Sequence, residues 1–199
     1  MPICDGCGTR ADDLHIRRRA ERLELASHFR PARVRVLFLD AAPPTRSEDF
    51  FYCAAADRSS RSLASRMFFD QIALAAGAPP SAEIVESLAL AEFKRAGYFL
   101  LHAIECPLEE IDRPQDAIRR FAPSVIKRVQ TDYDPSYLVP VAQPTQDLIR
   151  LFGLIGWGDR LVLNNGGPFA DPYLGDPQRQ ASFGTAFGAR IQKFLAALP

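Results

Sequence analysis

The stretch Val34-Arg35-Val36-Leu37-Phe38-Leu39-Asp40 decides how this chain folds. It is short and mostly apolar, and prolines lie on both sides of it, which is typical of a buried β-strand. Three more runs of this kind follow, at residues 98–104, 137–141 and 160–163. Pro140 lies inside the third run, and because proline cannot donate a backbone hydrogen bond, that run is expected at a bulge or at a sheet edge.

Helical patterns separate these runs. They cover residues 10–30, 60–76, 81–95, 114–130, 144–155 and 178–197. Strands that alternate with helices, through connections long enough for crossovers, indicate a parallel sheet with helices on both faces. The expected fold is therefore a single α/β domain over residues 1–199, with a mainly parallel four-stranded sheet. Residues 1–30 form its N-terminal tail and a basic helix.

Composition narrows the class of protein. The chain has 199 residues, 24 basic and 24 acidic side chains, and 47% hydrophobic residues. This apolar content is too high for a disordered chain, and charges interrupt each apolar stretch before the about 18 residues of a membrane span. Zero net charge alone points to neither a nucleic acid nor a membrane. The start lacks a signal-peptide pattern, so a cytoplasmic location is expected.

Parallel α/β sheets bind ligands at the carboxyl ends of their strands. In this chain those ends are followed by residues 40–52, 102–108, 142–145 and 164–176. No phosphate-binding glycine loop and no hydrolase serine motif stands at any of them. The candidate site therefore depends on single residues in these four segments.

Each of those residues has a functional and a structural interpretation. Asp40 could orient a water molecule or cap a turn, and Phe50-Phe51-Tyr52 could stack on a flat ligand or pack in the core. His102 could be catalytic or could be a satisfied strand histidine. Asn164 and Asn165 could offer amides to a ligand, although the two glycines after them favour a turn.

The cysteines suggest a metal site. Cys4 and Cys7 form a Cys-x-x-Cys that has glycine inside and after it, as in a metal-binding knuckle, or they are free or redox-active thiols. Cys53 and Cys106 stand alone. None of the three histidines is spaced i, i+4 from another, so no histidine-based metal site is expected.

These motifs resemble the uracil-DNA glycosylase superfamily, particularly its iron–sulfur branch. The resemblance runs through the Cys-x-x-Cys, Leu37–Pro44, Glu48–Tyr52, His102–Pro107 and, for the last motif, either the segment 162–168 or the later segment 171–177. It implies a divergent DNA glycosylase that flips a damaged or deaminated base out of DNA and hydrolyses its N-glycosidic bond. The alternatives are a non-catalytic nucleobase- or nucleic-acid-binding module with this fold, and a metal- or thiol-dependent enzyme built on Cys4 and Cys7.

The resemblance also assigns roles to residues. It implies that Asp40 and Asn165 are catalytic, and that Ala42, Phe51, His102 and Asn164 bind the base. It implies an iron–sulfur cluster on Cys4, Cys7 and Cys106. The family's fourth cysteine, in the helix after Pro107, is missing here, so Cys53 is expected to complete the site, for a cluster or for zinc. DNA would meet local basic residues, namely Arg17–Arg19, Arg58, Arg61 and Arg179. Three further departures are clear: the family's acid falls on Ala41, its uracil-reading Asn is His102, and its last His is absent.

Overall fold

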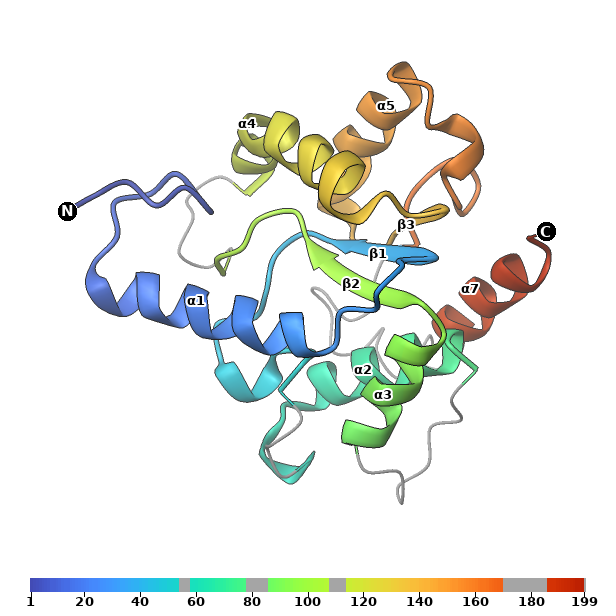
Figure 1. The fold of residues 1–199 in the computed structure, drawn as a ribbon, viewed down its shortest axis with the longest axis horizontal. Helices are drawn as coiled ribbons and strands as arrows, with labels where there is room; N and C mark the ends of the chain where they lie inside the picture. Colours follow the sequence, from blue (N-terminus) through green and yellow to red (C-terminus); the bar gives the residue numbers. More distant parts are fainter. Residues whose placement is uncertain (54–57, 78–85, 108–113, 170–185, 199) are drawn as a thin grey trace.

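The computed structural model describes residues 1–53, 58–77, 86–107, 114–169 and 186–198 (Figure 1). Its centre is a parallel sheet with the strand order β2-β1-β3. These strands are β1 (Val36–Asp40), β2 (Tyr98–His102) and β3 (Tyr137–Pro140). The α/β class and the parallel sheet predicted from the sequence are thus confirmed.

Strand β1 lies in the middle because it is apolar on both faces, as strands of covered parallel sheets are. Leu37, Phe38 and Leu39 are completely buried. The register pairs Asp40 with His102, so the carboxyl ends of β1 and β2 lie side by side. This pairing places the two polar side chains together, as expected for residues at the carboxyl ends of adjacent parallel strands.

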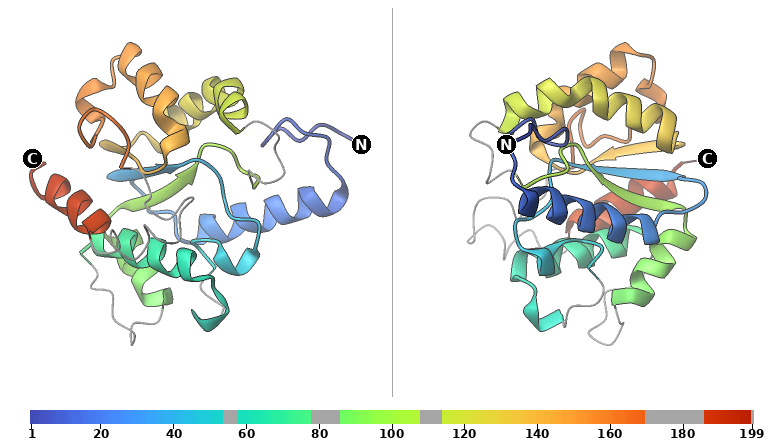
Figure 2. Two further views of the ribbon diagram at one scale, coloured as in Figure 1. Left: turned by 180° about the vertical axis from the view of Figure 1, so that it is seen from behind. Right: turned by 60° about the vertical axis from the view of Figure 1, so that its left-hand side comes forward.

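Helices cover both faces of the sheet (Figures 1 and 2). The α-helices are α1 (Asp13–His28), α2 (Leu63–Ala75), α3 (Glu86–Arg95), α4 (Pro114–Lys127), α5 (Gln146–Leu154) and α7 (Ala186–Ala196). In the figures α4 and α5 lie on one side, α2, α3 and α7 lie on the other, and α1 runs beside β2. None of the described helices combines the length and the apolar character that crossing a membrane requires.

Shorter helical turns connect these elements. The 3-10 turns are Ser47–Asp49, Arg58–Ser60, Gln143–Thr145 and Gly158–Arg160, and a π-helical turn, Arg128–Tyr133, continues α4. Asp134 then takes a left-handed conformation (φ 35°), and its N–H donates to the carbonyl of Val129. The chain can therefore leave the helix and enter β3 within a few residues.

The expected fourth strand at 160–163 is reduced to a single parallel bridge between Leu138 and Leu161, so the described residues form three strands rather than four. Val162 donates to Leu138, but a tight turn at Asn164 ends the pairing after that bond. The sequence predicted that Pro140 lies at a bulge or at a sheet edge, and the edge position is confirmed. Pro140 is the last residue of edge strand β3, and its carbonyl accepts from Phe169.

The other edge of the sheet, along β2, is closed by a side chain. The buried Tyr52 hydroxyl donates to the Leu100 carbonyl (3.0 Å) and accepts from the Leu100 N–H (2.6 Å). It therefore replaces the neighbouring strand that β2 lacks on that side. The aromatic run after β1 is consequently part of the core.

Candidate metal centre and the neighbouring cavity

The N-terminal segment folds into a tight turn ahead of α1. Cys4 donates its N–H to Thr9 (2.8 Å), and Gly8 donates to the Cys4 carbonyl (2.7 Å). Gly8 has a φ of 73°, which glycine adopts at little cost and which other residues rarely adopt. The turn brings Cys4 and Cys7 to the same side of the segment, as a metal-binding knuckle does.

Two further ligands come from distant parts of the chain. Cys106 follows β2, and its Sγ lies 3.7 Å from the Sγ of Cys4. His15 lies in the first turn of α1, with its Nε2 3.1 Å from the Sγ of Cys106 and 3.6 Å from the Sγ of Cys7. All four ligand atoms lie within 4.8 Å of one another, the cysteines are buried and His15 is half-buried. This group could hold a metal ion such as zinc.

The ligand set differs from the sequence prediction at one position, because His15 rather than Cys53 completes the group. Cys53 directly follows Tyr52, which is anchored to Leu100 in the middle of β2, whereas Cys106 lies beyond the end of that strand. The sequence prediction of no histidine ligand considered only pairs of histidines spaced i, i+4. It did not consider a site of three cysteines and one histidine. A usable signal was Asp12, whose carboxylate caps α1 by accepting the His15 N–H (2.8 Å), and which therefore fixes where His15 stands.

The protonation of Cys106 reflects its surroundings. Burial raises the pKa of this thiol well above its ordinary value, and the neighbouring sulfurs of Cys7 and Cys4 raise it further. Without a cation nearby, the Cys106 thiol therefore keeps its proton. A bound metal ion reverses this preference, since it stabilises the thiolates that ligate it.

An ion-pair network surrounds the metal centre. Glu105 pairs with Arg19 of α1 through one carboxylate oxygen and with Arg128 through the other, and Arg19 also pairs with Asp5. A Cβ at Gly6 would lie 2.5 Å from the Arg19 Nε, so a larger residue there would displace this arginine side chain. The network ties the N-terminal turn, α1 and the segment after β2 together around the four ligands.

Asp40 and His102 meet at the carboxyl edge of the sheet, with Asp40 Oδ2 3.5 Å from His102 Nε2. The other Asp40 oxygen accepts the Ala41 N–H (2.7 Å), so the turn-capping interpretation also applies. Burial, together with the positive charges of Arg22 and Arg128, lowers the pKa of His102 to about 3. The imidazole is therefore neutral at physiological pH.

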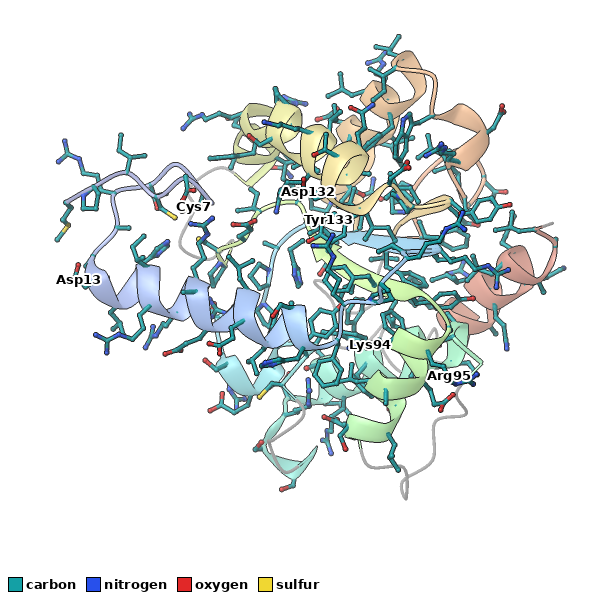
Figure 3. All side chains as sticks on the ribbon, viewed as in Figure 1. Cys7, Asp13, Lys94, Arg95, Asp132 and Tyr133 are labelled. Carbon is teal, nitrogen blue, oxygen red and sulfur yellow. The ribbon has the colours of Figure 1, made fainter. Side chains whose placement is uncertain are left out.

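A cavity with a volume of about 210 Å³ opens beside His102. It lies between the second half of α1, strand β2 and the π-helical turn, and Phe50, Arg22, Glu105 and Arg128 are among the residues that line it. Figure 3 shows Tyr133, another lining residue, near the end of α1 opposite Asp13, whereas Cys7 lies nearer the Asp13 end. The metal centre and the cavity thus share α1 but occupy different parts of it.

No protein-family model, curated protein or solved structure matches this chain. The resemblance to the uracil-DNA glycosylase superfamily therefore stays a prediction.

Of the residues that the resemblance placed against the base, one lines the cavity and others pack in the core. His102 lines the cavity. Phe51 is buried among the rings of Phe68, Phe69 and Phe93, so this ring packs in the core; its neighbour Phe50 lines the cavity instead, 5.8 Å from the His102 ring. Ala42 is half-buried and packs against the core just after β1.

Asn164 and Asn165 form a turn. Asn164 and Gly167 exchange two backbone hydrogen bonds (2.9 and 3.1 Å), and Asn165 and Gly166 between them both have positive φ values. This is the turn that an Asn-Gly pair favours. The Leu161 bridge that precedes it is three strand spacings from β2, roughly 14 Å, so the turn starts on the far side of the sheet from His102.

The expected DNA-facing arginines also differ in position. Arg17 and Arg18 are exposed on α1, while Arg19 belongs to the network around Glu105. The prediction for Arg61 was wrong, because its side chain is completely buried and pairs with Glu86 (2.9 Å), and it donates to the Cys53 carbonyl (2.8 Å). Arg179 and the side chain of Arg58 lie outside the described residues.

Proposed function

We propose that this chain is a zinc-binding α/β protein, in which one zinc ion on Cys4, Cys7, Cys106 and His15 fastens the N-terminal turn to the end of β2. The observation that carries the proposal is the convergence of four ligand atoms within 4.8 Å, from three separate parts of the chain. Three thiolates and one imidazole are a common structural zinc set, and structural zinc sites are tetrahedral.

The spacing of the ligand atoms favours a single ion. Zinc lies about 2.3 Å from each sulfur, so a tetrahedral site holds its sulfurs about 3.8 Å apart. The Cys4–Cys106 distance of 3.7 Å agrees with this value. An iron–sulfur cluster places irons and sulfides between its cysteines, and its usual ligands are four cysteines. The compact mixed set therefore supports zinc over the cluster.

The role that this geometry supports is structural. A zinc ion would link Cys4 to Cys106, which are 102 positions apart, and would close a long loop much as a disulfide does. Four protein ligands would also complete the tetrahedron and leave no position open for a substrate, as in closed structural sites.

Metal analysis of the protein purified without chelators tests this proposal. We expect one zinc per chain in the wild type, loss of that zinc in Cys106→Ser, and full retention in the matched control Cys53→Ser. Cobalt substitution would show the ligand-field spectrum of a tetrahedral thiolate site. Protein that takes up neither metal contradicts the proposal, and about four irons per chain in a brown protein would establish the cluster instead.

A second candidate function is the binding of a nucleobase-like ligand, with hydrolysis of an N-glycosidic bond in damaged DNA as its most concrete activity. It is supported by the meeting of Asp40 and His102, 3.5 Å apart, beside the cavity. In this proposal His102 would contact the base, Asp40 would face the sugar, and exposed Arg17 and Arg18 would contact phosphates.

Release of free base from duplexes that carry uracil, hypoxanthine or xanthine tests the hydrolase. We expect release that Asp40→Asn abolishes, while Asp49→Asn, outside the candidate site, retains it. No release from any of these duplexes by folded, zinc-loaded protein would contradict the hydrolase. Binding of the same duplexes without release would support the non-catalytic module.

A further inference from the structure

The cavity beside His102 carries an excess of positive charge. Three arginines line it: Arg22 in α1, Arg30 just after the end of α1, and Arg128 in the π-helical turn. Glu105 is the only acid among the described lining residues, and its two oxygens are engaged by Arg19 and Arg128. The net charge of the wall is therefore positive.

The arginines are held in place by the backbone. Arg22 is buried and donates to the Thr45 carbonyl at 3.0 Å, and Arg128 donates to the Ala103 carbonyl at 2.7 Å. Both charges lie close enough to His102 to lower its pKa, so the cavity opposes the addition of another positive charge. An anion would experience the opposite effect, since fixed guanidinium groups in a partly desolvated site attract negative charge strongly.

Most of the other lining residues are apolar, and several of them are aromatic. The ring of Phe50 lies 5.8 Å from that of His102 at an interplanar angle of 30°, and Phe99 and Tyr133 stack at 5.3 Å and 23°. A volume of about 210 Å³ is below the roughly 300 Å³ at which sites for drug-sized ligands begin, and it suits a single ring with a small substituent.

We propose that this cavity binds a small planar carboxylate, an aromatic or heteroaromatic monocycle. The carboxylate would be held by Arg22, with the charge of Arg128 beside it, and the ring would lie against Phe50. A guanidinium matches a carboxylate with two parallel hydrogen bonds, while the aromatic walls favour a flat body. This site goes beyond the zinc proposal and does not depend on it. It also differs from a site for a neutral base such as uracil in the charge of its ligand.

Orotate and uracil are a matched pair for the test, since they share one ring and differ by a carboxylate. In calorimetric titrations of the zinc-loaded protein we expect orotate to bind at least tenfold more tightly than uracil. Benzoate should compete with orotate, and inorganic phosphate should not. This comparison uses the wild-type chain alone, so it does not depend on whether a variant folds.

Variants then locate the site. Arg22→Met keeps the length of the stem and removes the charge, and we expect orotate affinity to fall ten- to a hundredfold while uracil affinity and zinc content stay unchanged. Arg18→Met, on an exposed part of the same helix, is the control and should leave orotate binding intact.

Three results would overturn the proposal. Equal affinity for orotate and uracil would exclude a carboxylate site and would support the nucleobase proposal. Competition by phosphate as strong as that by benzoate would exclude a planar ligand. Absence of orotate binding by protein that retains its zinc would exclude the site while leaving the zinc proposal in place.

Discussion

The metal centre and the cavity lie at opposite ends of the same helix, yet they are built differently. The metal centre joins residues that are 102 positions apart, and its four side chains belong to only two residue types. The cavity is lined by common residue types from α1, β2 and the π-helical turn. A metal site requires particular donor atoms, whereas a cavity requires only a shape and a charge.

This difference matters for how each region responds to change. The metal centre depends on one ion, so loss of a single ligand affects the whole N-terminal turn. The cavity rests on a buried strand and on many backbone hydrogen bonds, so it should persist when one group is altered. The experiments below separate the two regions, starting with the largest expected effect.

Removal of zinc should lower the free energy of unfolding by about 4 kcal/mol when the free ion had been present at a thousand times its Kd. The loss should begin locally, because the ion would hold the N-terminal turn. Hydrogen exchange should show that the amides of Cys4 and Gly8 lose protection after chelation, while that of Leu100 in β2 keeps it. Equal loss of protection in both regions would contradict this difference.

His102 should make the stability of the cavity region depend on pH. The folded pKa of His102, about 3, lies below its unfolded value of about 6.5. At pH values between the two, only the unfolded chain binds a proton at His102. The contribution of the neutral imidazole to the free energy of unfolding is therefore complete above the unfolded pKa. It is lost as the pH falls towards 3, at up to about 1.4 kcal/mol per pH unit.

Urea denaturation over this pH range measures the effect. His102→Gln should lose less stability per pH unit on acidification than the wild type, whereas His28→Gln, at an exposed position, should follow the wild type. The charges that face His102 are Asp40, Arg22 and Arg128, and all three remain in both variants. Parallel pH profiles for His102→Gln and the wild type would rule out a neutral buried imidazole.

Tyr52→Phe should destabilise the cavity side of the molecule without changing the zinc content. It removes the hydroxyl that satisfies both the N–H and the carbonyl of Leu100, and buried unsatisfied groups cost about 1–3 kcal/mol. Thermal or urea unfolding measures the loss, with Tyr137→Phe at a half-buried position of β3 as control. A similar loss in both variants would mean that the two hydrogen bonds to Leu100 contribute no more than an ordinary half-buried hydroxyl.

Glu105→Gln should change ligand binding least, and it tests whether zinc binding and orotate binding are thermodynamically coupled. Glu105 adjoins the ligand Cys106 and pairs with Arg128 in the cavity wall. Chelation should weaken orotate binding a few-fold in the wild type and less in Glu105→Gln, and by linkage orotate should strengthen zinc binding by the same factor. Glu48→Gln, on an exposed turn, is the control. Independence of the two ligands in the wild type would show that the regions act separately.

The sequence by itself determined the elements and their class. The apolar runs at 34–39, 98–104 and 137–141 predicted three strands that the structure contains, because a strand buried on both faces must be apolar throughout. The Cys-x-x-Cys with its glycines predicted the N-terminal turn, since that local geometry depends on neighbouring residues. The run at 160–163 has the same apolar character, yet the turn at Asn164 limits it to one bridge.

Only the tertiary structure decided which side chains meet. His15 and Cys106 join the two N-terminal cysteines because α1 and the end of β2 pack together, and no local pattern encodes that distance. Packing against α2 and α3 likewise buries Phe51 and Arg61, which in the sequence look no different from ligand-contacting residues. Burial and long-range contacts depend on how all elements pack at once, whereas turn and strand propensities act over a few residues.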